Sequence, residues 1–210
     1  MTYRYLPIVT LFLLVPALFF SGCTSSRLAD THDTTLAVKS YDTWVDAQKT
    51  YDRQVRTSLD QIGQHITVYN SELAKSQPDI KVLRADTASD QQALRDWEAQ
   101  SSALDAATDR FNAETSVLNF SASPDARQAV DVVAQDMKIY SITMNDAEQH
   151  LVDYTNAMNA YLTPDDPDYW NDAFRVAAMD ANSKAVKTIA DGDEALAALS
   201  SAAKKLEAYQ

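Results

Sequence analysis

Glycine, proline and cysteine are scarce in this chain. Its 210 residues include 3 glycines, 6 prolines and 1 cysteine. Tight β-hairpin turns and the loops that surround bound phosphate groups both depend on glycine, so a β-rich fold and a glycine-rich nucleotide site are disfavoured. The composition therefore favours helices joined by a few short connectors.

The sequence also lacks the short motifs of the common enzyme classes. It contains no P-loop and no GxGxxG, CxxC, CxxCH, HExxH or GxSxG pattern. It has no Glu-x-x-His pair, which a ferritin-like di-iron bundle requires. We therefore expect a protein without catalytic activity and without a cofactor.

Positive charge is in the minority. The chain has 18 lysines and arginines against 30 aspartates and glutamates, which gives a formal net charge of −12 at pH 7. An acidic surface repels the phosphate backbone of nucleic acids and the headgroups of anionic lipids. We expect no nucleic-acid partner and no basic surface that docks on a membrane.

The N-terminal 23 residues have the layout of an export signal. One positive charge, Arg4, precedes an apolar run from Leu6 to Phe20, and the small residues Ser21 and Gly22 follow it. The run has 15 residues, whereas a helix needs about 20 to cross a bilayer. A cleaved signal is therefore favoured over a permanent membrane span.

The segment that ends this signal, residues 20–23, resembles the lipobox of bacterial and archaeal lipoproteins. The match lies in Ser21, Gly22 and Cys23, while Phe20 stands where the family usually has leucine. The resemblance implies that residues 1–22 are cleaved and that a diacylglycerol, carrying fatty acids such as palmitate, is attached to the sulfur of Cys23. Two acyl chains hold a protein on a membrane stably.

The same resemblance implies a location in the cell envelope, outside the cytoplasm. Thr24 follows the cysteine, where aspartate would signal retention in the inner membrane. We expect delivery to the outer membrane in a bacterium with two membranes, and otherwise to the outer face of the cell membrane. The alternative is an ordinary secretory signal cut elsewhere, with Cys23 as a lone buried thiol.

Prolines divide the rest of the chain into four segments of similar length. They stand at Pro78, at Pro124 and at the pair Pro164 and Pro167. We expect helices at about residues 34–76, 79–119, 124–162 and 165–209, with residues 23–33 as a flexible tether. Helices of about 40 residues are roughly 60 Å long, and connectors this short join antiparallel neighbours. The prediction is an all-α, up-down-up-down four-helix bundle with long, coiled-coil-like helices.

Apolar residues recur at spacings of three and four in each segment, as expected for a helix with one buried face. The third segment shows this pattern without a break. The predicted buried residues are Tyr41, Trp44, Tyr51, Val55, Leu59, Ile62, Ile66, Tyr69 and Leu73 in the first segment; Leu83, Leu94, Trp97, Leu104, Phe111 and Leu118 in the second; Ala126, Val130, Val133, Met137, Tyr140, Met144, Ala147, Leu151, Tyr154, Met158 and Tyr161 in the third; and Phe174, Ala178, Ala181, Ala185, Ile189, Leu196, Leu199, Ala203 and Leu206 in the fourth.

The second segment carries polar residues on this same face: Thr87, Asp90, Ser101, Thr108 and Thr115. They either line a ligand cavity or fix the register of the helices against mispairing, and we favour register.

Two sequence signals mark helix starts. Ser123 precedes Pro124, and Thr163 precedes Pro164, so each pair combines an N-cap residue with proline at the first helical position.

If the first helix rises from the lipid anchor, the connectors near residues 77–79 and 164–168 lie at the far end of the bundle.

Two groups of residues are candidates for a site. His65, Asp90, Asp146 and His150 fall at similar heights along the predicted bundle and include metal-ligand types, but we expect no metal site, because partly exposed histidines beside a core are commonly just polar surface. The second group is a possible recognition tip at the fourth helix start: Asp165, Asp166, Asp168, Tyr169 and Trp170. There too we favour a structural role, in which the acids cap the helix and Trp170 packs on the core.

The sequence thus predicts a lipid-anchored helical bundle that serves as a binding or scaffold module, with a protein partner or self-association. The alternative is a sensory bundle that binds a small ligand or metal and works with a partner protein. The expected architecture looks like the four-helix extracytoplasmic domains of chemoreceptors, which is an analogy of fold alone.

Overall fold

Four long helices make up the part of the chain that the computed structural model describes, residues 31–120, 123–164 and 170–210. They are α1 (Thr31–Leu73), α2 (Ile80–Ser116), α3 (Pro124–Tyr161) and α4 (Asp172–Glu207). The described residues contain no strand. The predicted export signal, Cys23 and most of the predicted tip, residues 165–169, lie outside the described residues.

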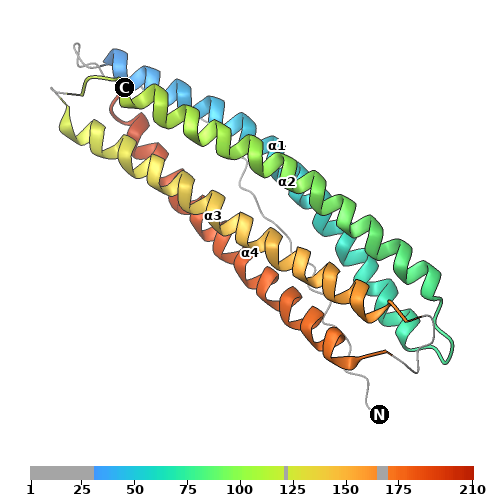
Figure 1. Ribbon diagram of the computed structural model, residues 1–210. Coiled ribbons are helices and arrows are strands. Elements are labelled where there is room, and N and C mark those ends of the chain that lie inside the picture. The colour runs from blue at the N-terminus through green and yellow to red at the C-terminus, as the bar shows by residue number, and fades with distance from the viewer. Residues whose placement is uncertain (1–30, 121–122, 165–169) are drawn as a thin grey trace.

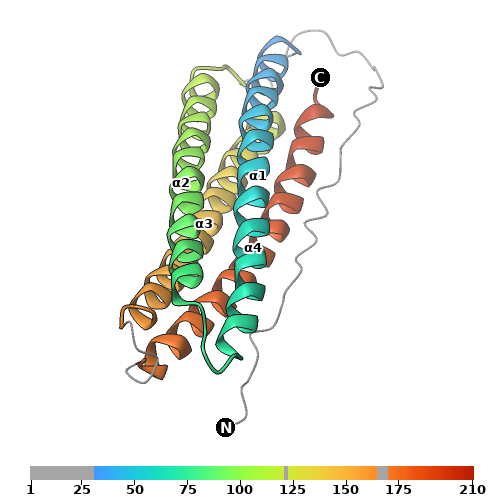
Figure 2. The same cartoon turned by 90° about the vertical axis from the view of Figure 1, so that its right-hand side faces the viewer.

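The helices run alternately up and down and pack as a four-sided bundle (Figures 1 and 2). Each helix packs against its neighbours in the chain, and α4 returns to pack against α1. The α3–α4 side is the most closely packed and the α1–α4 side the least. The predicted up-down-up-down bundle is confirmed.

The first helix begins earlier than predicted. Residues 31–33, assigned to the tether, belong to α1, and the predicted end at residue 76 moves back to Leu73. The Asp33 carboxylate accepts a hydrogen bond of 3.0 Å from the backbone N–H of Asn119, which ties the first turn of α1 to the α2–α3 connector. Thr34, one residue on, is fully buried. These contacts hold the first turn in place.

The starts of α2 and α3 follow the predicted boundaries closely. Asp79 caps α2 by accepting from the backbone N–H groups of Lys81 and Val82 at 3.1 and 3.2 Å. Pro124 opens α3 as predicted, and Ser123 is the cap residue, but its side chain makes no capping hydrogen bond. Proline alone therefore marks that start.

The predicted start of α4 at Thr163 and Pro164 is wrong. The Thr163 hydroxyl instead donates to the carbonyl of Asn159 at 2.9 Å, so it closes the end of α3. α4 begins at Asp172, where Asn171 accepts from the N–H of Ala173 at 3.0 Å. Asparagine is at least as good a cap as threonine, so the proline after Thr163 was the only feature that favoured the earlier site.

The predicted core is largely confirmed. All eleven predicted residues of α3 are buried. On α1, Leu59 is only partly buried, because Ser58 takes the core position and donates a 2.9 Å hydrogen bond to the carbonyl of Ala93. On α4, Phe174 is 42% exposed. The others that are only partly buried are Leu73, Leu118 and Leu196.

Small side chains explain the close packing of α3 and α4. Five alanines of α4 are buried: Ala178, Ala181, Ala185, Ala202 and Ala203. Gly192, which the apolar pattern passed over, is also buried, and a β-carbon there would lie 2.5 Å from the sulfur of Met144. The absence of a side chain thus lets Met144 of α3 pack directly on the α4 backbone.

Substituting alanine for each of the two described glycines should change the stability of the protein differently. A β-carbon at Gly63 meets nothing within 4 Å, so Gly63→Ala should raise the free energy of unfolding by about 0.5–1 kcal/mol, the helix-propensity gain. Gly192→Ala forces Met144 to move, which should offset that gain. Thermal and denaturant unfolding measures both; equal stabilisation by the two substitutions would contradict the packing described here.

Candidate functional site

Four of the five polar residues on the α2 face are hydrogen-bonded to other helices, and the exception is Thr115, whose hydroxyl donates to carbonyls of α2 itself. Thr108 accepts from the indole N–H of Trp44 at 2.9 Å, and Ser101 donates to the Glu148 carboxylate at 2.8 Å. Trp97, on the same face, donates its indole N–H to the Tyr51 hydroxyl at 2.8 Å. These bonds join α2 to α1 and to α3, which supports a register role for the polar face.

An aromatic cluster lies beside these bonds and joins three helices. The Tyr140 ring of α3 meets Trp44 and Tyr51 of α1 edge-on, each with ring centroids 6.2 Å apart. Tyr51 in turn meets Trp97 of α2 edge-on at 6.4 Å. The Tyr140 hydroxyl donates to the Asp52 carboxylate at 2.8 Å. The middle of the bundle is therefore a packed core rather than a cavity.

A histidine held between two aspartates is the most chemically distinctive group in the described structure. His65 of α1 places its Nδ1 2.5 Å from Oδ1 of Asp90 and its Nε2 3.7 Å from Oδ1 of Asp86, both on α2. Asp90 is fully buried, whereas the side chains of His65 and Asp86 keep 18% and 19% of their surface exposed. One imidazole nitrogen thus faces the core, and the other lies near the surface.

Burial and hydrogen bonds set the protonation of Asp90 and of its neighbour Tyr69. Burial raises the pKa of its carboxyl, while the hydrogen bond and charge of His65 lower that pKa in part. The Tyr69 hydroxyl lies 2.9 Å from the hydroxyl of Thr87 and donates to the other Asp90 oxygen at 3.5 Å. Burial also raises the pKa of Tyr69 well above its usual value, so Tyr69 stays a neutral donor.

Two buried oxygens in this region have no hydrogen-bond partner, Oδ2 of Asp86 and the hydroxyl of Tyr154. Tyr154 of α3 is fully buried, and burial raises its pKa, with smaller contributions from Tyr69 and Asp90. An unsatisfied buried polar atom costs about 1–3 kcal/mol, so such atoms mark either a tolerated defect or a binding position.

The structure brings together only half of the predicted four-residue metal group. His65 pairs with Asp90, whereas Asp146 is exposed on α3 and His150 is partly exposed there. Within the described ranges, no group of three or more histidine, cysteine, aspartate or glutamate side chains is arranged around one ion. The pattern missed Asp86, which lies one helical turn before Asp90 and therefore faces the same histidine.

The described part of the tip supports a structural role for its aromatic residue. Trp170 is partly buried against the core, its ring centroid lies 4.9 Å from that of Tyr161, and its indole N–H donates to the Pro164 carbonyl at 3.1 Å. The rest of the tip, Asp165, Asp166, Asp168 and Tyr169, lies outside the described residues, so the recognition tip stays a prediction.

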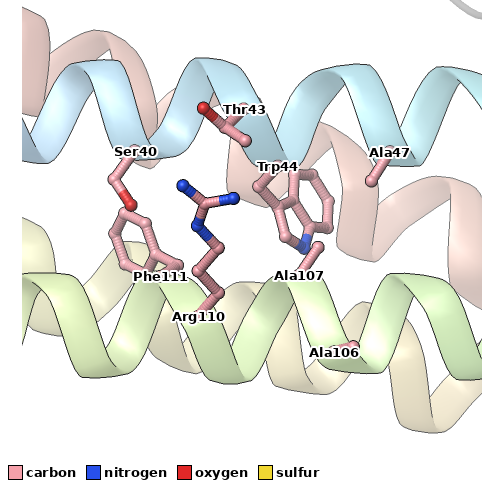
Figure 3. A pocket seen from close by; sticks show the side chains of 8 residues that line it. All are labelled: Ser40, Thr43, Trp44, Ala47, Ala106, Ala107, Arg110 and Phe111. Atoms are coloured by element: carbon pink, nitrogen blue, oxygen red, sulfur yellow. The ribbon is translucent and has the colours of Figure 1, made fainter.

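A shallow groove lies between α1 and α2, nearer the end where α1 begins. Its volume is about 250 Å³, below the roughly 300–1,000 Å³ of most ligand pockets. Figure 3 shows Arg110 reaching from α2 toward α1 between Ser40 and Trp44. Arg110 pairs with the Glu114 carboxylate at 2.7 Å, and Ser40 donates to the same carboxylate at 2.6 Å. The charge at the groove mouth is therefore already neutralised.

Among the described residues, none of the four helices contains an apolar stretch that could span a bilayer. Comparisons of the chain with protein-family models, with curated proteins and with solved structures give no match.

Two tyrosine substitutions test the hydrogen-bond assignment. Tyr154→Phe removes an unpartnered hydroxyl and should leave stability unchanged or raise it by up to about 1 kcal/mol, whereas Tyr51→Phe orphans the buried Trp97 N–H and should cost about 1–3 kcal/mol. Denaturant unfolding of both variants is the measurement. A large loss in Tyr154→Phe would mean that its hydroxyl has a partner.

The α1–α4 side carries like charges that face each other. Asp52 and Asp193 repel across it, as do Asp42 and Glu207, with Arg56 attracting the first pair. Burial is the main cause that raises the pKa of each of these four carboxyls. The facing charge adds to it for Asp193 and Glu207, whereas for Asp42 the added charge is that of Asp46 on the same helix. The described carboxyls whose pKa is raised are Asp42, Asp52, Asp90, Asp136, Glu148, Asp193 and Glu207.

These shifts predict a bundle that is more stable in mild acid than at neutral pH. The folded state holds the protons more tightly than the unfolded chain, whose carboxyls titrate near 3.8 and 4.5. Stability should therefore fall as the pH rises above about 4–5 and through the raised values. Glu72 and Glu114, whose pKa values are lowered by hydrogen bonds to Lys75 and Ser40, act in the opposite sense.

Melting temperature measured between pH 4.5 and pH 8 tests this sign. Asp193→Asn should flatten the decline, since it removes one raised carboxyl and its repulsion with Asp52. Asp109→Asn, at an exposed position of α2, is the matched control and should leave the slope unchanged. A melting temperature that rises steadily toward pH 8 would contradict the prediction.

Proposed function

We propose that this protein is a lipid-anchored, extracytoplasmic lipoprotein whose helical bundle is a non-enzymatic binding or scaffold module. The observation that carries the proposal is the single cysteine, Cys23, placed directly after an apolar run of 15 residues and the small pair Ser21 and Gly22. An exported chain with one cysteine cannot close an internal disulfide, and lipidation gives that thiol a use.

The start of the bundle is compatible with a short anchor. α1 begins at Thr31, so seven residues separate it from Cys23. At a maximum of about 3.5 Å per residue, such a segment reaches no more than roughly 28 Å. The end of the bundle that carries the start of α1, the α2–α3 connector and the C-terminus would then face the membrane (Figure 2). The α1–α2 connector would stand roughly 60 Å farther out.

The described interior favours a binding or scaffold role over catalysis. Most polar side chains of the α2 face bond to side chains of neighbouring helices, and the aromatic cluster fills the middle. Such a rigid rod presents helix faces and connectors as its recognition surfaces. The proposed partners are another protein or a second copy of this chain, together with the membrane through the lipid, and no nucleic acid is proposed because the chain is acidic.

The anchor is tested by growing cells that express the full chain with a labelled fatty acid. The wild type should incorporate label and sediment with membranes, and Cys23→Ser should lose both, because serine offers no thiol for the diacylglycerol. Ser26→Ala, three residues on, is the matched control and should behave as the wild type. Label retained by Cys23→Ser would overturn the lipoprotein proposal.

The groove between α1 and α2 favours one second candidate, a sensory bundle that binds a small ligand and works with a partner protein. Its lining of Trp44, Phe111 and three alanines suits a small apolar molecule. Native mass spectrometry of the purified chain separates the two functions: a retained small molecule that is lost in Ala107→Trp supports the ligand binder, and self-association without a ligand supports the scaffold.

A further inference from the structure

We infer that His65 and Asp86 form a binding site for a divalent transition-metal ion such as Zn²⁺, with Asp90 orienting the histidine from the core side. This inference does not depend on lipidation of Cys23, because all three side chains lie within the described bundle.

The spacing of the two donor atoms fits one ion. Nε2 of His65 and Oδ1 of Asp86 are 3.7 Å apart. Two ligands that each lie about 2.0–2.2 Å from a tetrahedral zinc ion are separated by roughly 3.4 Å, so a small side-chain adjustment suffices. Both side chains keep nearly a fifth of their surface exposed, which gives an ion a route from solvent.

Asp90 prepares His65 for this role. A buried carboxylate 2.5 Å from Nδ1 favours a proton on that nitrogen and leaves the Nε2 lone pair directed toward Asp86. Metal-binding histidines commonly donate their second N–H to a carboxylate in this way, which fixes the ring and strengthens the ligand. Asp90 itself lies on the far side of the ring and is a positioning residue rather than a ligand.

Asp86 supplies the second observation. Its Oδ2 is buried and makes no hydrogen bond, which is costly for a carboxylate oxygen. An ion between His65 and Asp86 would offset the negative charge of that carboxylate at a position where no lysine or arginine is paired with it among the described ion pairs.

The chemistry of the pair selects the ion. Imidazole nitrogen with carboxylate oxygen suits Zn²⁺, Cu²⁺ or Ni²⁺ and disfavours Ca²⁺ and Mg²⁺, which prefer all-oxygen sites. With two protein ligands, water completes the coordination, so the site holds an exchangeable ion rather than a permanent structural one.

The test is isothermal titration calorimetry of the full chain in detergent with Zn²⁺ alone. A second titration, with Co²⁺, is followed by the visible absorption of the bound ion. His65→Gln and Asp86→Asn should each weaken Zn²⁺ affinity at least tenfold, and Asp90→Asn should weaken it by about 10–100-fold through loss of orientation. His150→Gln, which removes a partly exposed histidine from α3, is the matched control and should change nothing.

Nitrogen NMR of the wild-type histidines keeps the test decisive if a variant fails to fold. Zn²⁺ should shift the Nε2 resonance of His65 and leave the proton on Nδ1. The proposal is overturned if the wild type binds no Zn²⁺ at millimolar concentration, if His150→Gln loses as much affinity as His65→Gln, or if Nδ1 of His65 is the nitrogen that shifts.

Discussion

The hydrogen bonds that the α2 face makes with its neighbours set the register on which the rest of the bundle depends. An apolar seam alone lets one helix slide past another by a turn at modest cost, because leucine packs against most partners. A buried indole N–H that must find Thr108, or one that must find Tyr51, forbids such a slip, since the donor would be left unsatisfied. The same register places His65 beside Asp86 and Asp90.

The fold was largely predictable because one physical rule governs most of it. A period of three and four residues over about 40 positions specifies which face of each helix is buried, and the unbroken pattern on α3 is confirmed at every position. The failures have local causes. Ser58 displaced Leu59 from the core through a hydrogen bond to the Ala93 carbonyl, and Asn171 rather than Thr163 capped α4. The Ser58 bond depends on a partner from another helix, whereas the Asn171 cap is a local alternative to Thr163 that the proline signal outweighed.

The candidate site was less predictable, because it depends on contacts between helices that only the folded chain supplies. His65 and Asp90 stood out as residue types at matching heights, but Asp86 gave no signal beyond being one turn from Asp90. Asp146 and His150 shared that height and face elsewhere, because height along a bundle does not specify which side of a helix a residue occupies. The side is decided by the rotation of each helix about its axis, which the core sets after packing.

The hydrogen bond between Asp33 and the Asn119 backbone determines how the bundle carries mechanical load. It fastens the first turn of α1 at the end where the chain enters the bundle. A force applied there along the bundle axis pulls α1 lengthwise past α2 instead of peeling it away turn by turn. The interhelical bonds along α1, from Trp44 to Tyr69, then lie in parallel and resist together. We expect such a rod to resist tension along its length better than a sideways pull that opens the α1–α4 side, where the helices are least closely packed.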